Sequence, residues 1–448
     1  DAAAMGGPHN WSFVGTGTPD RHDLPVPRGK VVGGSSAING QVFLRGIPED
    51  FENWAAMGND QWDFLKVLPY FRKQETDNDI RDDFHGSEGP MPVRRFKQSE
   101  WLPFHQAFHD ALIDKGFPYD PDMNHPESQG VGPIPMNNPD GVRMSTGLTY
   151  INLSRHRLNL TIKANVLVRR VLFDGKKAIG AEVESGGERF TVEADQIVLS
   201  AGAIASPHLL MLSGVGPAEQ LERQGIPVIR NLPGVGQNLR DHPIVPVVYK
   251  VKDNFPQDPR APRYQLALRY TATGSDDRND MQILPSAFSS PIGASDPYEQ
   301  EGVRFTCVLE LANGFGELTL TSNDPSVQPH LNYRYLEGAW DRERLREAVR
   351  LAMDLVEHPM YKDIIDRRLQ PNEADIQSDE TLDDYMLRST VNTTHISGTC
   401  KLGPASDENA VVDQYCRVHG LENIRVADAS VMPNVVRANT NSTTIMIG

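Results

Sequence analysis

The alternation of hydrophobic and polar residues predicts β structure in the middle of the chain. Residues 158–173, LNLTIKANVLVRRVLF, are rich in β-branched residues, and residues 178–202 continue the pattern. Within the second stretch, AEVES and RFTVE alternate on either side of GG, as the two strands of a hairpin do. The apolar run QIVLS then predicts a buried strand that leads into GAIASPHLLMLSGVG.

A second region with a β-like pattern lies between residues 246 and 340, where GELTLTS alternates apolar and polar residues. An amphipathic helix is predicted over residues 341–358, because Leu345, Val349, Ala352 and Val356 fall on one helical face. Glycine-rich segments occur at the beginning, in the middle and at the end of the chain. We expect one domain built from three separate pieces, with a second domain inserted between them.

Composition narrows the class of protein. The length of 448 residues favours two or three domains, and 39% hydrophobic with 23% charged residues is typical of a globular protein. No window approaches eighteen apolar residues, so no transmembrane segment is predicted. The net charge of −16 argues against nucleic acid and anionic membranes as main partners.

The cysteines and the chain ends carry further information. Three cysteines, Cys307, Cys400 and Cys416, cannot form a disulfide framework, which fits a reducing, cytoplasmic location best. The first residues, DAAAMGGPHNW, lack an initiating Met and do not form a signal peptide. The last residues, TNSTTIMIG, stop inside an apolar run. We therefore expect the sequence to be a fragment of a longer chain.

Two glycine-rich segments have the composition of a cofactor site. In GKVVGGSSAING, residues 29–40, Gly33, Gly34 and the serines after them could present consecutive N–H groups to an anion, although a plain glycine turn would also explain this stretch alone. In GAIASPHLLMLSGVG, residues 202–216, Ser206 and Pro207 predict the start of a helix. Its N-terminus would face the edge of the sheet where cofactors bind.

Taken together, the segments resemble the glucose–methanol–choline (GMC) oxidoreductases, flavoenzymes that use FAD. Residues 29–52 and 202–216 match the two family signatures, and PGVGQNLRDH (233–242), HISGTCKLG (395–403) and IRVADASVMPNVVRANTNSTTIMIG (424–448) follow in family order. The resemblance covers essentially the whole chain. It implies an α/β fold, α+β overall, with a Rossmann-like FAD-binding domain of residues 1–50, 151–245 and 391–448. Residues 51–150 and 246–390 would form an inserted substrate domain with an antiparallel sheet.

The chain departs from the family pattern at its front. Family members begin with a βαβ unit that carries G-x-G-x-x-G and is followed by an acidic residue for the adenosine ribose, and neither feature occurs here. GVGPIP and GVGPAE have Pro in the spacer, and GVGQNL lacks the third Gly. We therefore expect that a βαβ unit of roughly 30 or more residues and a final helix are missing. A chain of this extent should bind FAD poorly.

The resemblance implies oxidation of an alcohol CH–OH group to a carbonyl by hydride transfer to flavin N5. His395 opens HISGTCKLG, where the family places its active-site base, and a neutral imidazole suits that task. Asn439 falls on the second active-site position, where it can orient the substrate oxygen but cannot shuttle a proton. Asn441 is the alternative, because in an extended segment it would face the same side as Asn439.

The family frame also implies the contacts with FAD. Ile38 stands where some members carry a His that binds FAD covalently, so non-covalent FAD is expected. The other expected contacts are Gly33, Gly34 and Ser35 as an anion cradle; Asn39 and Gly40 at the flavin ring; Val166 at the adenine; Ala201 and Gly202 near the adenosine or pyrophosphate; Asp428 and Ala429 near the ribityl–pyrophosphate region; and Asn439 and Thr440 at the isoalloxazine.

Two alternatives remain open from the sequence, and a third interpretation, a zinc site, is disfavoured. The chain could be a lyase on the same fold, similar to the hydroxynitrile lyases, or an inactive fragment. His395, Cys400, Cys416 and His419 loosely resemble a zinc site, but their spacing matches no standard pair of zinc knuckles and no metal is expected. The sequence leaves open which alcohol is oxidised, and whether oxygen, a quinone or another carrier accepts the electrons.

Overall fold

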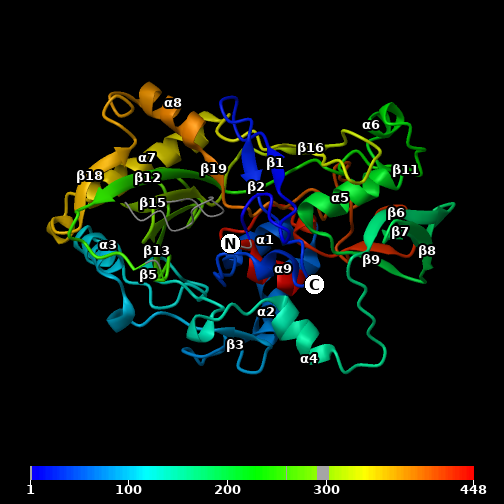
Figure 1. Cartoon of the computed structure of the whole chain (residues 1–448), viewed down its shortest axis with the longest axis horizontal. Helices are drawn as coiled ribbons and strands as arrows, with labels where there is room; N and C mark the ends of the chain where they lie inside the picture. Colours follow the sequence, from blue (N-terminus) through cyan, green and yellow to red (C-terminus); the bar gives the residue numbers. More distant parts are fainter. Residues whose placement is uncertain (1–2, 259, 290–301) are drawn as a thin grey trace.

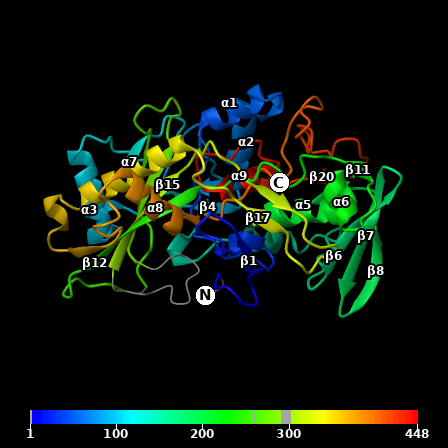
Figure 2. The same ribbon diagram turned by 90° about the horizontal axis from the view of Figure 1, so that it is seen from above.

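The computed structural model describes residues 3–258, 260–289 and 302–448. Both views show a molecule extended along one axis, with a large antiparallel sheet at one end and a three-stranded sheet at the other (Figures 1 and 2). The two chain ends lie near the middle, between the sheets (Figure 1). Among the described residues, no helix is long and apolar enough to cross a membrane.

The large sheet has the strand order β18-β12-β15-β14-β13-β5, and β19 pairs with the beginning of β12. All of these pairings are antiparallel, as expected for the substrate-side sheet. The strands are β5 (Gly130–Pro133), β12 (Pro243–Val251), β13 (Leu266–Tyr270), β14 (Met281–Ser286), β15 (Gly302–Leu309), β18 (Ile365–Gln370) and β19 (Val391–Asn392).

Both faces of this sheet are covered. Alternate residues of β15, such as Cys307, belong to the larger hydrophobic cluster, which contains helices α3 (Pro103–Asp114) and α7 (Ala339–Leu355). Val308 points to the opposite face and packs in a second cluster with Phe51 of α1 (Pro48–Ala56). The predicted amphipathic helix corresponds to α7, whose Leu345, Val349 and Ala352 are fully buried.

The three-stranded sheet contains the predicted hairpin, but the strand predicted before that hairpin is shorter than expected. Strands β7 (Lys177–Ser185) and β8 (Glu188–Glu193) pair antiparallel about Gly186 and Gly187. The strand before them, β6 (Leu167–Asp174), starts later than predicted, because residues 158–166 form no strand. Leu158 in that stretch is fully exposed, and none of the described strands pairs with residues 158–166.

Helix α5 (Gly202–Leu212) begins four residues before the predicted start at Ser206. Pro207 lies inside it and has no N–H for the carbonyl of Ala203, but the Thr399 hydroxyl donates to that oxygen at 2.6 Å. Asp428 Oδ2 accepts hydrogen bonds from the Gly202 N–H at 2.8 Å and the Ser206 hydroxyl at 2.6 Å. Side chains from the C-terminal part of the chain therefore allow this helix to begin early.

Strands β9 (Ile197–Leu199) and β20 (Ile424–Val426) form a parallel pair beside α5. Val198 is 53% exposed, so the prediction of a fully buried strand was wrong, while Leu199 is buried. The remaining elements are α2 (Phe64–Gln74), α4 (Asn152–Ser154), α6 (Ala218–Arg223), α8 (Asp379–Ser389), α9 (Thr440–Ile447), β1 (Phe13–Gly15), β2 (Leu24–Val26), β3 (Glu75–Asp77), β4 (Met91–Val93), β10 (Val215–Gly216), β11 (Arg230–Asn231), β16 (Glu317–Thr319) and β17 (His330–Asn332), with short 3₁₀ or π turns between them.

Candidate active site

The pairing of β12 with β19 brings two histidines together. Pro243 at the start of β12 lies opposite Asn392 at the end of β19. The pairing resumes beyond both strands, where Arg240 and Ser397 exchange backbone hydrogen bonds of 3.0 and 2.9 Å. His242 and His395 lie between these contacts, and their rings meet edge to face with centroids 5.1 Å apart.

Asp241 holds the two histidine segments in place. Its Oδ1 accepts hydrogen bonds from the backbone N–H groups of His242 at 2.8 Å and His395 at 2.9 Å, and from the Thr393 hydroxyl at 2.6 Å. Burial raises the pKa of Asp241 to about 6, although the Thr393 hydrogen bond and the Arg28 charge oppose the shift. The Arg28 guanidinium donates to the Thr394 carbonyl at 2.7 Å, which ties the first glycine-rich segment to this loop.

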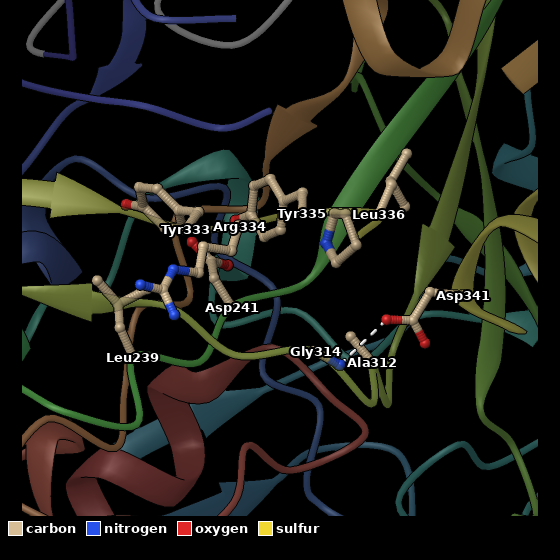
Figure 3. Close-up of a pocket in the computed structure, with 10 residues that line it drawn as sticks. Leu239, Asp241, Ala312, Gly314, Tyr333, Arg334, Tyr335, Leu336 and Asp341 are labelled. Atoms are coloured by element: carbon tan, nitrogen blue, oxygen red, sulfur yellow. Dashed lines mark hydrogen bonds between the residues drawn. The ribbon is translucent and has the colours of Figure 1, made fainter. Parts of the chain in front are cut away.

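A small pocket lies beside Asp241 (Figure 3). Figure 3 shows Tyr333 and Tyr335 next to the Asp241 carboxylate, and Asp341 accepting a hydrogen bond from the Gly314 N–H. The free space is sufficient for about one water molecule. Neither His395 nor Asn439 lines this pocket, so we do not regard it as the place where a substrate binds.

His395 has a polar partner on each side of its ring. Nδ1 lies 2.9 Å from Nδ1 of His242, and Nε2 lies 3.1 Å from Nδ2 of Asn439. Burial, together with the nearby His242 and Arg28, holds the pKa of His395 well below its usual value of 6.5. The imidazole is therefore neutral near pH 7 and can accept a proton.

Asn439 immediately precedes α9, and Asn441 lies inside that helix. The segment is helical rather than extended, so the expectation that both side chains face the same side was wrong. The contact with His395 Nε2 is made by Asn439. Asn439 Oδ1 and Asn441 Nδ2 are buried and have no hydrogen-bond partner among the described residues.

The first glycine-rich segment forms a tight turn. Gly33 and Gly34 have φ of +92° and +54°, and a Cβ on Gly33 would lie 2.8 Å from the Gly147 nitrogen. The Ser35 hydroxyl accepts a hydrogen bond of 3.2 Å from the Gly29 N–H, so it stabilises the turn itself. Arg143 donates to Asn39 Oδ1 at 2.8 Å and also to the Asn39 carbonyl.

The other predicted cofactor contacts occupy three places. Ala201 and Gly202 lie at the start of α5, and both carboxylate oxygens of Asp428 are engaged there, since Oδ1 accepts from the Ser430 N–H at 2.8 Å. Ala429 follows Asp428, and Thr440 begins α9. Val166 directly precedes β6 and is half-buried. The hydrogen bond from Gly202 to Asp428 joins the second glycine-rich segment to the C-terminal one.

These residues fit an FAD molecule. Atoms at the Cβ positions of Gly34, Gly40 and Gly202 would meet no other heavy atom within 4 Å, so the backbone there is open to a ligand. The N-terminus of the eleven-residue helix α5 is already capped, because the Gly202 N–H donates to Asp428 at 2.8 Å and the Ala201 N–H donates to the Ser206 hydroxyl at 3.0 Å. The unpartnered polar atoms of Asn439 and Asn441 offer a donor and an acceptor to a heterocycle or an alcohol.

The candidate zinc ligands serve other roles. His395 contacts His242, and His419 Nε2 lies 3.0 Å from the Gly403 carbonyl. Within the described ranges, groups of three possible metal ligands occur elsewhere, at Glu75, Asp77 and His85 and at Asp82, His85 and Asp122. Arginines already pair with three of those carboxylates, as described in the Discussion.

Sequence reasoning missed three residues near His395. Asp241 and His242 stand in the quoted stretch PGVGQNLRDH, but nothing in their spacing linked them to His395. Glu310 lies near the end of the β-like stretch VRFTCVLEL, and an acidic residue between Leu309 and Leu311 was the signal available. Its role depends on a partner that only the fold brings close.

The sequence of this chain matches models of a known protein family. The family model described as GMC oxidoreductase matches in two parts, the N-terminal model over residues 14–244 and the C-terminal model over residues 313–448. The chain belongs to the GMC oxidoreductase family. An uncharacterised GMC-type oxidoreductase of Rhodococcus erythropolis is 36% identical over 98% of this chain and 84% of its own length.

Other relatives of this GMC oxidoreductase have more specific names. An oxygen-dependent choline dehydrogenase of Chromohalobacter salexigens is 34% identical over 98% of this chain and 83% of its own length. The crystal structure of pyridoxine 4-oxidase from Mesorbium loti superposes with a TM-score of 0.91 at 28% identity, covering 99% of this chain and 87% of that one. The chain is thus a choline dehydrogenase-like flavoprotein with the GMC fold of an FAD-binding part and a substrate-binding part.

Proposed function

We propose that this protein is an FAD-dependent oxidoreductase that oxidises the CH–OH group of an alcohol to a carbonyl. The observation that carries the proposal is the neutral His395, whose Nε2 lies 3.1 Å from the Asn439 carboxamide. Names of relatives such as choline dehydrogenase and pyridoxine 4-oxidase agree with an alcohol substrate. Bound FAD would supply the acceptor for the hydride that leaves the alcohol carbon.

The residues of the chain would divide the remaining work. His395 Nε2 accepts the hydroxyl proton, which raises the electron density on the alcohol oxygen as the hydride leaves. Asn439 Nδ2 donates a hydrogen bond to that oxygen and holds it beside the base. Burial of the imidazole keeps it neutral, and therefore ready to act as a base, near pH 7.

The proposed contacts with FAD include the glycines beside which the structure leaves open space. The N–H groups of Gly33 and Ser35 would bind phosphate oxygens, whereas the Gly34 N–H already donates to the Val31 carbonyl at 2.8 Å. Ala201 and Gly202 would approach the cofactor at the start of α5 without donating to it, because their N–H groups donate to Ser206 and Asp428. Asp428 would act through its backbone, because its carboxylate caps α5. Ile38 offers no nucleophile, so FAD would be held without a covalent bond. The remaining proposed contacts are Asn39, Gly40, Val166, Ala429, Asn439 and Thr440.

The proposed division into domains follows from the same sites. Residues 1–50, 151–245 and 391–448 supply the cofactor contacts, and residues 51–150 and 246–390 supply most of the large antiparallel sheet. The substrate-binding part would determine which alcohol binds, because surface loops generally vary more in sequence than the strands and helices they connect.

Anaerobic mixing of the flavin-loaded protein with single alcohols tests the proposal. The panel contains choline, pyridoxine, an aryl alcohol and a simple aliphatic alcohol. Bleaching of the flavin absorbance with formation of the matching aldehyde supports the proposal and identifies the substrate class. Release of cyanide from a hydroxynitrile without bleaching would instead indicate a lyase.

A further inference from the structure

The hydrogen-bond partners of His242 determine which nitrogen of His395 carries a proton. His242 Nε2 lies 3.1 Å from the Val436 carbonyl, and a carbonyl can only accept, so Nε2 carries the hydrogen. Burial lowers the pKa of His242 to about 3, which leaves the ring neutral with its lone pair on Nδ1. His395 Nδ1, 2.9 Å away, must then donate. The lone pair of His395 therefore lies on Nε2, the nitrogen beside Asn439.

A buried carboxyl group lies next to the same nitrogen of His242. Glu310 Oε2 is 3.3 Å from His242 Nδ1, and this oxygen has no hydrogen-bond partner in the described part of the chain. Glu310 follows β15 and projects from the face that also carries Val308. Its residue surface is only 2% exposed.

The charges around Glu310 come from several elements. Burial raises its pKa to about 8, the Arg269 guanidinium of β13 opposes that rise, and the carboxylates of Asp50 and Asp241 add to it. The balance makes Glu310 neutral at low pH and ionised above about pH 8. A neutral Glu310 can donate its proton to His242 Nδ1 and compete with His395, whereas the ionised form can only accept.

We propose that His242 and Glu310 are positioning residues that form a proton relay behind His395, and this inference rests on the proposed function. When the alcohol O–H bond breaks, a bond forms between that hydrogen and His395 Nε2. The Nδ1–H bond of His395 breaks and an Nδ1–H bond forms on His242, which now carries hydrogen on both nitrogens. That Nδ1 proton then moves to Glu310 Oε2.

The relay leaves both imidazoles neutral. His395 ends with its hydrogen on Nε2, His242 returns to its starting form, and the negative charge of Glu310 is neutralised by the proton. No electrons leave these residues, because bound FAD would supply the acceptor for the hydride of the alcohol carbon. After the carbonyl product departs, solvent removes the Nε2 proton of His395 while the relay runs backwards to restore Nδ1–H.

Nitrogen NMR of the histidine rings tests the resting state without any turnover. In ¹⁵N-labelled protein near pH 9, where Glu310 is ionised and can only accept, the relay predicts the Nε2–H tautomer for His242 and the Nδ1–H tautomer for His395. Signals are assigned by their loss in His242→Gln and His395→Gln. An Nε2–H tautomer for His395 would overturn the relay, because its lone pair would then point away from the alcohol.

Kinetics of Glu310→Gln test the role of the carboxylate. In the wild type, flavin reduction by the alcohol should rise with pH around pH 8 as Glu310 ionises. In Glu310→Gln that rise should disappear, and the rate above pH 8 should fall by about 10–100-fold, as for residues that orient metal-bound histidines. Glu193→Gln, at an exposed position of β8, is the control and should keep the wild-type profile.

Failure of the relay can be told apart from failure of the proposed function. A Glu310→Gln variant with the wild-type pH profile, beside a His395→Ala variant that is slow, would reject the relay and leave His395 as the base. A His395→Ala variant with the wild-type rate would reject both. Thermal unfolding shows whether Glu310→Gln folds. Because the pKa of Glu310 is raised in the folded state, the wild type loses stability as pH rises towards 8, whereas the variant does not. The variant should therefore become more stable relative to the wild type over that range.

Discussion

At the residue scale, Asn439 and Asn441 allow a matched test of the active-site geometry. Asn439→Ala removes the amide beside His395 Nε2, so the alcohol should bind in a poor orientation and flavin reduction should slow by about 10²-fold. Asn441→Ala removes a buried amide on α9 that does not contact His395 Nε2, and should therefore slow flavin reduction less than Asn439→Ala does. Anaerobic stopped-flow absorbance compares the two.

The pH dependence of these variants separates orientation from proton transfer. The wild-type rise near pH 8 should survive in Asn439→Ala, because the amide does not titrate. Asn439→His should recover part of the lost rate by restoring a polar contact. If Asn441→Ala were slow and Asn439→Ala normal, the assignment of the second active-site residue would be wrong.

At the element scale, a buried ion-pair network joins β3 to the loops that surround it. His85 Nδ1 lies 3.0 Å from Asp77, and Nε2 lies 2.8 Å from Asp122. Arg95 pairs with the same two carboxylates at 2.8 and 2.7 Å, and Arg45 pairs with Glu75 at 2.5 Å. Three cations therefore face three carboxylates, and we interpret the cluster as a structural network.

His85→Ala should destabilise the protein by about 3–5 kcal/mol, the usual cost of removing one partner from a buried ion pair. Burial disfavours the imidazolium, but the hydrogen bonds that it donates to Asp122, Asp77 and Glu75 raise the pKa of His85 to about 11. A raised histidine pKa stabilises the fold below pH 6.5, and this contribution is lost as pH rises through about 11. Denaturant unfolding near pH 7 measures the effect.

The control for this variant is His156→Ala, at an exposed position. It should change the free energy of unfolding by less than about 0.5 kcal/mol. A His85→Ala variant as stable as this control would show that the network contributes nothing to the fold.

Local pattern predicted some elements well and others poorly, for identifiable reasons. Helix α7 and the β7–β8 hairpin were predictable, because periodicity and the Gly186–Gly187 turn act within a few residues. The start of α5 was not, because Thr399 and Asp428, which complete its first turn, are distant in sequence. Residues 158–166 have a β-like composition, but composition does not provide a partner strand.

The candidate site was predicted unevenly for a related reason. His395 and Asn439 came from the family resemblance, and the structure places their side chains 3.1 Å apart. Glu310 and His242 could not be connected from sequence, because β15 and the start of β12 bring them together only through sheet pairing. The periodicity of hydrophobic residues along the chain does not show which strands pair, so it cannot predict such contacts.

At the scale of the whole molecule, FAD should be held without a covalent bond, because Ile38 offers no nucleophile. Acid precipitation of the yellow protein should release the flavin into the supernatant. Flavin that remains with the washed, denatured pellet would refute this expectation.

The central claim is that His395 is the base, and anaerobic stopped-flow reduction of His395→Ala tests it most directly. Positioned acid–base catalysis contributes roughly 10²–10⁴-fold, so the variant should reduce its flavin more slowly than the wild type by about that factor. Its flavin content should be unchanged, because the proposed phosphate contacts lie in other segments, and its rate should no longer rise near pH 8. A His395→Ala variant that reduces its flavin at the wild-type rate would contradict the account.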